Sequence, residues 1–442
     1  MEKEKKTDKS KKRTSGVFGK KARIRQEKLD NTANIFPVIA TEQMTNVYRL
    51  AITLKEPVKP ELLQKALDEI LPKFQYMNLR IRTGIFWYYF ETNINGAPKV
   101  TEEADFPCRK FDLHKNKYYL FSVTYYKCRI NLEVFHVLAD GMGGINFLRE
   151  LVYEYLRLAH PENLDIANDT ISEETSFNRE DSYLKNFRAT SPNGYKSKPA
   201  VHVTGNHFPK GMLGVIHGYL SVRELKEKSR ALGVSINEYL AGIYAYSIYK
   251  EQLRSMPSKD PIVVCVPVNL RPYFNSWTTR NFFVMVSVDF LPTKDKYTPE
   301  EVIQIVAEGL RAQMNKENLE NLFSYNVSNQ KNFVLRAVPL FLKKIAIKAV
   351  YRTNAKATTT TLTNVGNLQI DSKYQSYISH FQAILSISTG QNIKASVCSY
   401  QDIFCLTFAT DLNDLAIPSC CFRTLRSLGL TVQVETNGAW KE

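Results

Sequence analysis

The sequence predicts an α+β protein built from two similar halves. In each half, helix-like stretches are mixed with consecutive strand-like stretches, and this favours α+β sheets over a strictly alternating doubly wound sheet. Residues 160–200 interrupt this pattern with little periodicity, and a strand followed by helix caps restarts it. At 442 residues the chain can bury two cores. We therefore expect a basic tail over 1–30, a first subdomain over 31–160, a crossover linker over 161–200 and a second subdomain over 201–442.

The first half should begin with a strand over 46–54. Pro60 then opens a helix, because proline is favoured in the first helical turn. Leu63, Leu67 and Ile70 share one face of this helix, as a packed helix requires. Four further strands are expected at 78–83, 86–91, 118–126 and 130–135. A second helix is expected at 146–158.

The second half should begin with a strand over 215–220. Capping boxes then open helices at Ser221, Ser235 and Thr298, because the pattern Ser/Thr-x-x-Glu satisfies free backbone N–H groups. A basic amphipathic helix is expected over 339–351, and for it packing on the core is favoured over a membrane-surface role. The remaining strands are expected at 262–268, 282–290, 379–387, 395–400, 403–410 and 430–435. One more helix is expected at 418–428.

The charge is positive and uneven. The formal net charge is +15, and residues 1–30 alone hold twelve Lys/Arg against five Asp/Glu. Such a stretch is typical of a disordered, solvated arm, which is favoured here over nucleic-acid binding. The excess on the folded part would suit an anionic ligand. The sequence contains no run of 18 apolar residues, so no integral membrane segment is expected.

The cysteines indicate a reducing compartment. Their number, seven, is odd, and no Cys-x-x-Cys pair occurs. Reduced, buried thiols in a cytoplasmic protein explain this pattern best. The seven histidines show no metal-ligand spacing with the cysteines, so no metal site is expected.

The segment His136-Val137-Leu138-Ala139-Asp140-Gly141 is the most informative motif. It follows a strand-like run and precedes a helix-like run. A histidine in this position can act as a base at neutral pH. Asp140 can anchor the turn that holds the histidine, and Gly141 allows backbone to pass close by.

Two later stretches complete a pattern with this motif. The first is Val266-Pro267-Val268-Asn269-Leu270-Arg271, followed by Arg280-Asn281-Phe282-Phe283. The second is the threonine-rich run that ends in Thr363-Asn364-Val365-Gly366. A hydroxyl or amide in the second stretch could donate a hydrogen bond to an oxyanion.

In this order, the three elements resemble those of coenzyme A-dependent acyltransferases of the chloramphenicol-acetyltransferase type. The likeness extends over about residues 30–435 and is nearest to the alcohol acetyltransferase-like branch. Many relatives have a second histidine where this chain has Phe135, so His136 is the candidate base. This difference makes a condensation-domain function less favoured.

The resemblance implies two subdomains, each a mixed sheet flanked by helices, with an active-site tunnel between them. His136 would be the general base, and Arg271 would pair with Asp140 as a structural pin. Thr363 or Asn364 would stabilise the oxyanion. The donor would be acyl-CoA, such as acetyl-CoA, used as a co-substrate with no permanently bound cofactor, and the acceptor a small alcohol or amine.

Two other functions remain open. One is condensation-type ester or amide formation from an acyl group bound to a carrier protein, which a partner would have to supply. The other is a non-catalytic binding module of the same fold. The chain is expected to be a monomer.

Overall fold

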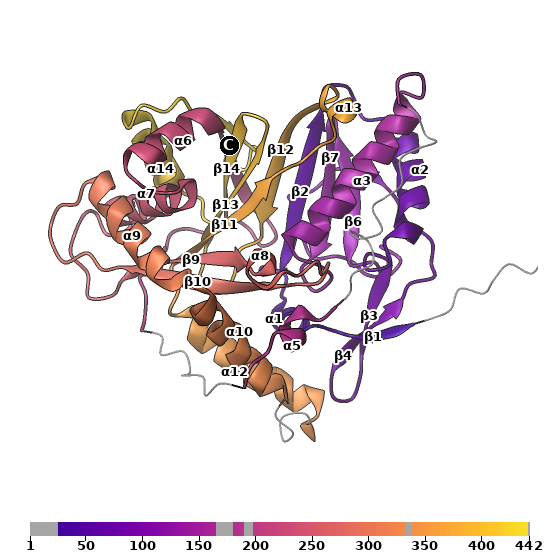
Figure 1. Ribbon diagram of the computed structural model, residues 1–442, viewed down its shortest axis with the longest axis horizontal. Helices are drawn as coiled ribbons and strands as arrows, with labels where there is room; N and C mark the ends of the chain where they lie inside the picture. Colours follow the sequence, from indigo (N-terminus) through magenta and orange to yellow (C-terminus); the bar gives the residue numbers. More distant parts are fainter. Residues whose placement is uncertain (1–24, 165–179, 190–197, 332–336, 441–442) are drawn as a thin grey trace, which may run out of the picture.

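The computed structural model describes residues 25–164, 180–189, 198–331 and 337–440. It confirms the predicted α+β class: two mixed sheets are flanked by helices and lie side by side (Figure 1). Most of the expected linker and most of the expected tail lie outside the described residues. No helix in the described ranges is long and apolar enough to cross a membrane.

The first sheet has five strands and packs one face against two helices, α2 (Pro60–Ile70) and α3 (Gly141–Ala159). Leu63, Leu67 and Ile70 of α2 are fully buried, as their spacing predicted. The strands are, in spatial order, β12 (Ile378–Leu385), β2 (Val47–Leu54), β7 (Arg129–Phe135), β6 (Phe121–Tyr126) and β5 (Thr101–Glu102).

The second sheet has seven strands. At the left of Figure 1, on the side turned away from the first sheet, lie α6 (Val222–Ala231), α7 (Ile236–Glu251), α9 (Pro299–Gln313) and α14 (Ala416–Ser427). The predicted caps form: Ser235 and Thr298 make complete capping boxes, and Ser221 accepts from Glu224. The strands are, in order, β10 (Phe283–Phe290), β9 (Ile262–Asn269), β11 (Thr360–Asn367), β13 (Ile393–Tyr400), β14 (Ile403–Thr410), β8 (Gly214–Ser221) and β15 (Gln433–Thr436).

The second half contributes one strand to the first sheet. β12 lies between β11 and β13 in sequence, yet it pairs antiparallel with β2 of the first sheet, with Phe381 opposite Ile52. β13 then returns to the second sheet through a short turn with a bridge between Ser388 and Gln391. The sequence placed this strand in the second subdomain, because its apolar pattern carries no information about which sheet edge it completes.

A three-stranded sheet lies at one end of the first half. Its strands are, in order, β1 (Gln26–Lys28), β4 (Tyr88–Thr92) and β3 (Leu79–Thr83). β1 falls inside the segment 1–30 that was expected to be a tail, so the folded chain begins earlier than predicted. The described part of this segment ends at Asp30, whose side chain is buried.

Several short or peripheral helices complete the described structure. α12 lies along the lower edge of the molecule in Figure 1 and contacts α1. Of its side chains only Leu340 and Lys343 are buried. The expectation that this helix packs on the core is therefore wrong for most of its surface. These helices are α1 (Phe36–Ile39), α5 (Ser182–Lys185), α8 (Arg271–Phe274), α10 (Lys316–Lys331), α12 (Leu340–Ala355) and α13 (Ser372–Gln375).

Candidate active site

His136 directly follows β7 and lies at the boundary between the two halves. Its backbone N–H donates to the Asn46 carbonyl over 2.9 Å, which fixes the turn after the strand. Its Nδ1 atom lies 3.1 Å from Oδ1 of Asn281, which directly precedes Phe282 and β10 of the second half. Among the described residues no group hydrogen-bonds to the other ring nitrogen, Nε2.

The surroundings of Asn281 determine which nitrogen of His136 carries the proton. Its amide Nδ2 donates to the Asp30 carboxylate over 3.1 Å and to the His136 carbonyl over 3.3 Å. Because both partners are acceptors, the amide oxygen must face the imidazole ring. Nδ1 is therefore the protonated nitrogen, and Nε2 keeps its lone pair.

Asp30 has an unusual environment for a carboxylate. It is 3% exposed, and its second oxygen accepts from the Ala33 N–H over 2.7 Å. Burial raises the pKa of Asp30 to about 7, although its hydrogen bonds with Ala33 and Asn281 oppose this shift. The carboxyl group is thus held by hydrogen-bond donors at the end of the Asp30–Asn281–His136 chain.

Three aromatic rings surround the imidazole. Phe36 of α1 stacks on it with centroids 4.7 Å apart, Tyr48 meets it edge-on at 5.2 Å, and Phe283 lies at 5.6 Å. Burial in this environment lowers the pKa of His136, although the charge of Asp140 acts in the opposite direction. The ring is therefore held as a neutral imidazole, the form that can accept a proton.

Asp140 and Arg271 form the predicted ion pair. Arg271 Nη1 lies 2.8 Å from Asp140 Oδ2, and both side chains are largely buried. Asp140 is also the N-cap of α3, since its other oxygen accepts from the Gly143 N–H over 3.2 Å. Arg271 donates in addition to the Thr278 and Arg280 carbonyls at 2.9 and 2.8 Å. The pair joins the helix start of one half to the strand ends of the other.

Gly141 does not have the predicted role of leaving room. A Cβ atom built on it would lie 3.9 Å from Val365, which is ordinary contact. The tight position is Gly144, where a Cβ would lie 2.7 Å from the Tyr48 hydroxyl oxygen. That hydroxyl donates to the Asp140 carbonyl over 2.8 Å, so the lack of a side chain at Gly144 keeps the turn intact.

Thr363 and Asn364 point to opposite sides of β11. Thr363 pairs in register with Ser396 of β13, whose hydroxyl donates to β12 of the first sheet, so Thr363 faces the first half. Asn364 is exposed and donates to Asn237 of α7 over 2.8 Å. Asn364 therefore lies on the face of β11 opposite Thr363, because adjacent strand residues alternate between faces. The expected turn is a strand with a bulge next to Gly366.

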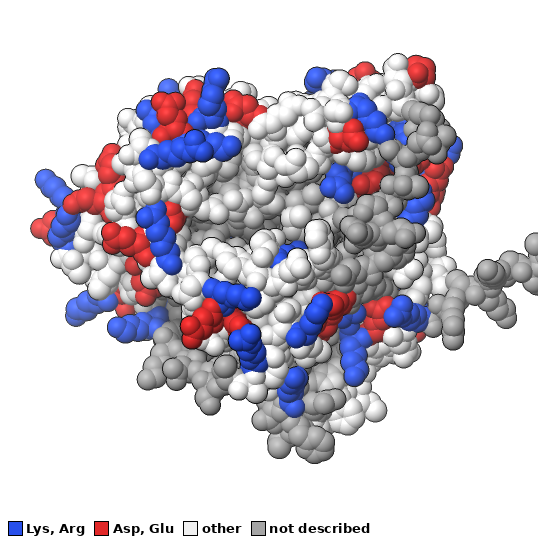
Figure 2. Space-filling model, in the orientation of Figure 1, with Lys and Arg blue, Asp and Glu red and all other residues white. Residues whose placement is uncertain are grey.

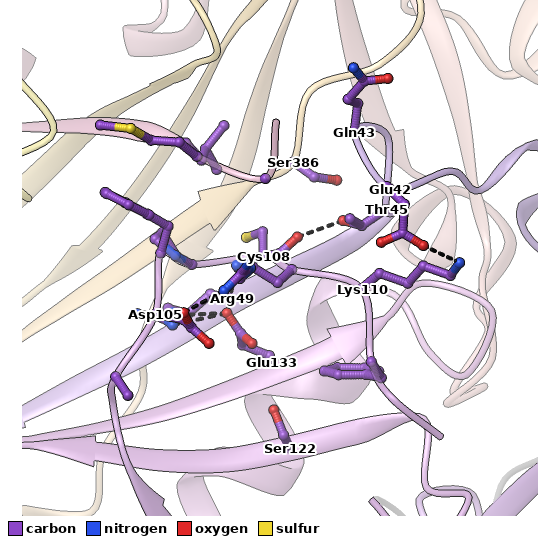
Figure 3. A pocket seen from close by; sticks show the side chains of 18 of the residues that line it. Glu42, Gln43, Thr45, Arg49, Asp105, Cys108, Lys110, Ser122, Glu133 and Ser386 are labelled. Carbon is purple, nitrogen blue, oxygen red and sulfur yellow. Dashed lines mark hydrogen bonds and ion pairs between the residues drawn. The ribbon is translucent and has the colours of Figure 1, made fainter. Parts of the chain in front are cut away.

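A cavity of about 770 Å³ lies between loops of both halves (Figure 3). Glu133 at its wall accepts from Arg49 over 2.9 Å and from the Cys108 N–H over 2.6 Å. Thr45 donates to the Cys108 carbonyl over 2.7 Å, so this loop is pinned to the first sheet. The lining contains none of the predicted site residues, and the cavity is thus separate from the His136 centre.

Sequence reasoning missed Asp30 and assigned no role to Asn281. Asn281 belongs to the stretch that follows Arg271, so its place in that pattern was an available signal. The sequence held no such signal for Asp30, because this residue lies in a charged segment that resembles a tail. Arg280 of the same stretch binds Glu27 of β1 at 3.2 Å, and together these contacts fix the N-terminal segment beside the site. Within the described residues no cluster of His, Cys, Asp or Glu could hold a metal ion.

No protein-family model matches the sequence, and no curated protein matches it significantly. Solved structures do resemble the fold. TRI101 of F. graminearum, complexed with coenzyme A and T-2 mycotoxin, aligns with a TM-score of 0.61 at 10% identity, covering 91% of this chain and 97% of that one. Polyketide synthase associated protein 5 from Mycobacterium tuberculosis aligns with 0.56 at 14% identity, covering 91% and 96%.

The epimerization domain from the third module of tyrocidine synthetase B aligns with a TM-score of 0.54 at 10% identity, covering 94% of this chain and 97% of that domain. These likenesses show the fold that acetyltransferases share with condensation and epimerization domains. At such low identity they establish the architecture, and the chemistry has to be argued from the site.

Proposed function

We propose that this protein is an acyltransferase that moves an acyl group from acyl-CoA to an alcohol or amine, with His136 as general base. The observation that carries the proposal is the pattern of hydrogen bonds that Asn281 makes around the imidazole. Asn281 accepts from Nδ1, and Nε2 is left unprotonated and without a partner among the described residues. A neutral histidine with one free nitrogen is the group that such a transfer requires.

The proposed reaction assigns a role to each of these groups. The oxygen or nitrogen of the acceptor attacks the thioester carbonyl, and at the same time Nε2 of His136 takes the proton of that hydroxyl or amine. The carbonyl oxygen becomes an oxyanion, to which the Thr363 hydroxyl donates a hydrogen bond. When the carbon–sulfur bond breaks, His136 returns the proton to the leaving thiolate. Binding both substrates in one site removes much of the entropic barrier.

Asp140 and Arg271 have a positioning role in this proposal. Their ion pair binds the turn after His136 to the second half, so the imidazole and the β11 strand keep a fixed separation. The Asp140 carboxylate is saturated by Arg271, Gly143 and the Phe282 N–H, and it makes no hydrogen bond to the imidazole. The proton is therefore handled by the histidine alone.

The test is a thiol-release assay with acetyl-CoA and a panel of alcohols and amines. Wild-type protein should release coenzyme A only when an acceptor is present. His136→Ala should abolish release while the protein stays folded, whereas His114→Ala, at an exposed histidine in the first half, should keep full activity. Near-wild-type release by His136→Ala would contradict the assignment.

The same assay separates the other two functions. Release from an acyl carrier protein but from no acyl-CoA would identify a condensation-type enzyme, whose fold the chain shares. Binding of coenzyme A with no release from any donor would identify a non-catalytic module.

A further inference from the structure

The helix α12 exposes a row of large apolar side chains. Phe341 is 65% exposed, Ile345 66% and Val350 60%, and Leu342 also faces solvent. On a helix with 3.6 residues per turn Phe341, Leu342 and Ile345 fall on one face about 100° wide, and Val350 lies outside this face. An exposed apolar face of this kind is unusual for a helix without a partner.

A neighbouring turn extends this surface. Ile85, at the tip of the β3–β4 hairpin, is 77% exposed, and Phe86 beside it is 44% exposed. The turn is fixed to the helix, because the Leu340 N–H donates to the Ile85 carbonyl over 2.8 Å and Lys343 donates to the Phe86 carbonyl over 3.1 Å. We call this surface the α12 face: Ile85, Phe86, Phe341, Leu342 and Ile345.

Basic side chains run alongside the α12 face. Lys344, Lys348 and Arg352 are spaced four residues apart and so form a row on the helix, and the helix sequence contains no Asp or Glu. Lys344 lies over the Tyr88 ring at 5.1 Å, which directs it toward the same hairpin. Figure 2 shows blue rather than red side chains at the lower edge of the molecule, where α12 lies in Figure 1.

We propose that the α12 face binds the surface of an anionic lipid bilayer. A helix that carries an apolar row beside a basic row lies flat in the headgroup region, with the apolar side chains below the phosphates and the cations among them. The formal net charge of +15 favours the approach to an anionic membrane. If a second copy bound through the same face, the basic rows of the two copies would lie against each other. Their repulsion disfavours a symmetric dimer through this surface.

The test is co-sedimentation of the full chain with vesicles of phosphatidylcholine alone and of phosphatidylcholine mixed with phosphatidylserine. The wild type should bind the mixed vesicles, and salt should weaken the binding. Phe341→Ser with Ile345→Ser should lower partitioning by roughly tenfold or more. Lys348→Gln with Arg352→Gln should lower it about fivefold per charge removed.

Matched controls come from exposed residues outside α12 and the β3–β4 hairpin. Met256→Ser replaces a side chain that is 62% exposed, and Lys226→Gln with Arg230→Gln removes two exposed charges from α6. These variants should bind mixed vesicles as the wild type does, and they retain any contribution of the basic N-terminal segment. Melting temperatures should be equal across the set, because every substituted side chain is exposed.

Three results would overturn the proposal. The first is equal binding to neutral and mixed vesicles. The second is vesicle binding by the α12 variants within about twofold of the wild type and the controls. The third is self-association of the wild type, measured by sedimentation, that the apolar variant abolishes while vesicle binding is absent. The vesicle assay needs no acyl donor, so its outcome is independent of the proposed acyl transfer.

Discussion

Replacing Asp30 by Asn tests whether the Asp30–Asn281–His136 chain sets the protonation of the base. The carboxylate accepts two hydrogen bonds, from the Ala33 N–H and from Asn281 Nδ2. An amide of the same shape has only one oxygen, so its NH₂ group must face one of these donors. Asn281 can relieve that conflict by turning its amide over.

The turned amide would present its NH₂ group to Nδ1 of His136. The ring proton must then move to Nε2, and the base is lost. An unsatisfied buried donor costs about 1–3 kcal/mol, and the lost bond between Asn281 and the His136 carbonyl opposes the turn by up to about 1 kcal/mol. A net bias of about 1–2 kcal/mol corresponds to a decrease in turnover of roughly 5- to 30-fold.

Two measurements check this reasoning. Turnover should fall by that factor, and ¹⁵N NMR of the His136 ring should show the proton moving from Nδ1 to Nε2. Asp181→Asn is the matched control, since Asp181 caps α5 and makes no hydrogen bond to Asn281 or His136. Unchanged turnover together with an unchanged Nδ1–H signal in Asp30→Asn would refute the argument.

The pH dependence of stability gives a second readout for the same variant. Because burial raises the Asp30 pKa from 3.8 to about 7, the folded protein binds this proton more tightly than the unfolded chain does. The stability contribution is thus present at low pH and lost as the pH rises from about 4 to 7, by up to about 4 kcal/mol. Asp30→Asn should lack this loss in urea unfolding curves.

Three further predictions concern the rest of the site. Arg271→Met should lower the free energy of unfolding by about 3–5 kcal/mol, since it leaves its carboxylate partner buried without a cation; equal urea midpoints would contradict this. Gly144→Ala should lower both melting temperature and turnover, because the new Cβ displaces Tyr48, whereas Gly141→Ala should be tolerated. The acid limb of kcat/KM should have its midpoint below pH 6.5, because burial lowers the His136 pKa; a midpoint above 6.5 would mean that another group controls it.

The local part of the site could be predicted from sequence, because it depends on neighbouring residues. His136 and Asp140 lie on one turn, and the cap that Asp140 forms for α3 is a short-range interaction. The partner of Asp140 is 131 positions away, and only the resemblance to a known family indicated Arg271. Asp30 could not be predicted, because its contact with Asn281 joins residues 251 positions apart.

Another difference came from treating part of a strand as a turn. Thr363 and Asn364 were grouped as alternative oxyanion donors, yet the period of two in β11 places them on opposite faces. Such an alternation can be read from sequence once the strand is recognised. The placement of β12 could not be predicted from the sequence, because strand pairing is decided by which edge is open when the chain folds.

The position of β12 also constrains how the protein folds during synthesis. β2 pairs with β7 on one side and with β12 on the other, so its second edge stays unpaired until residue 385 has left the ribosome. An apolar strand with an open edge is prone to pair with other chains. The first half is therefore vulnerable to aggregation for most of the time that the second half is being made, and it is expected to need chaperone protection through that interval.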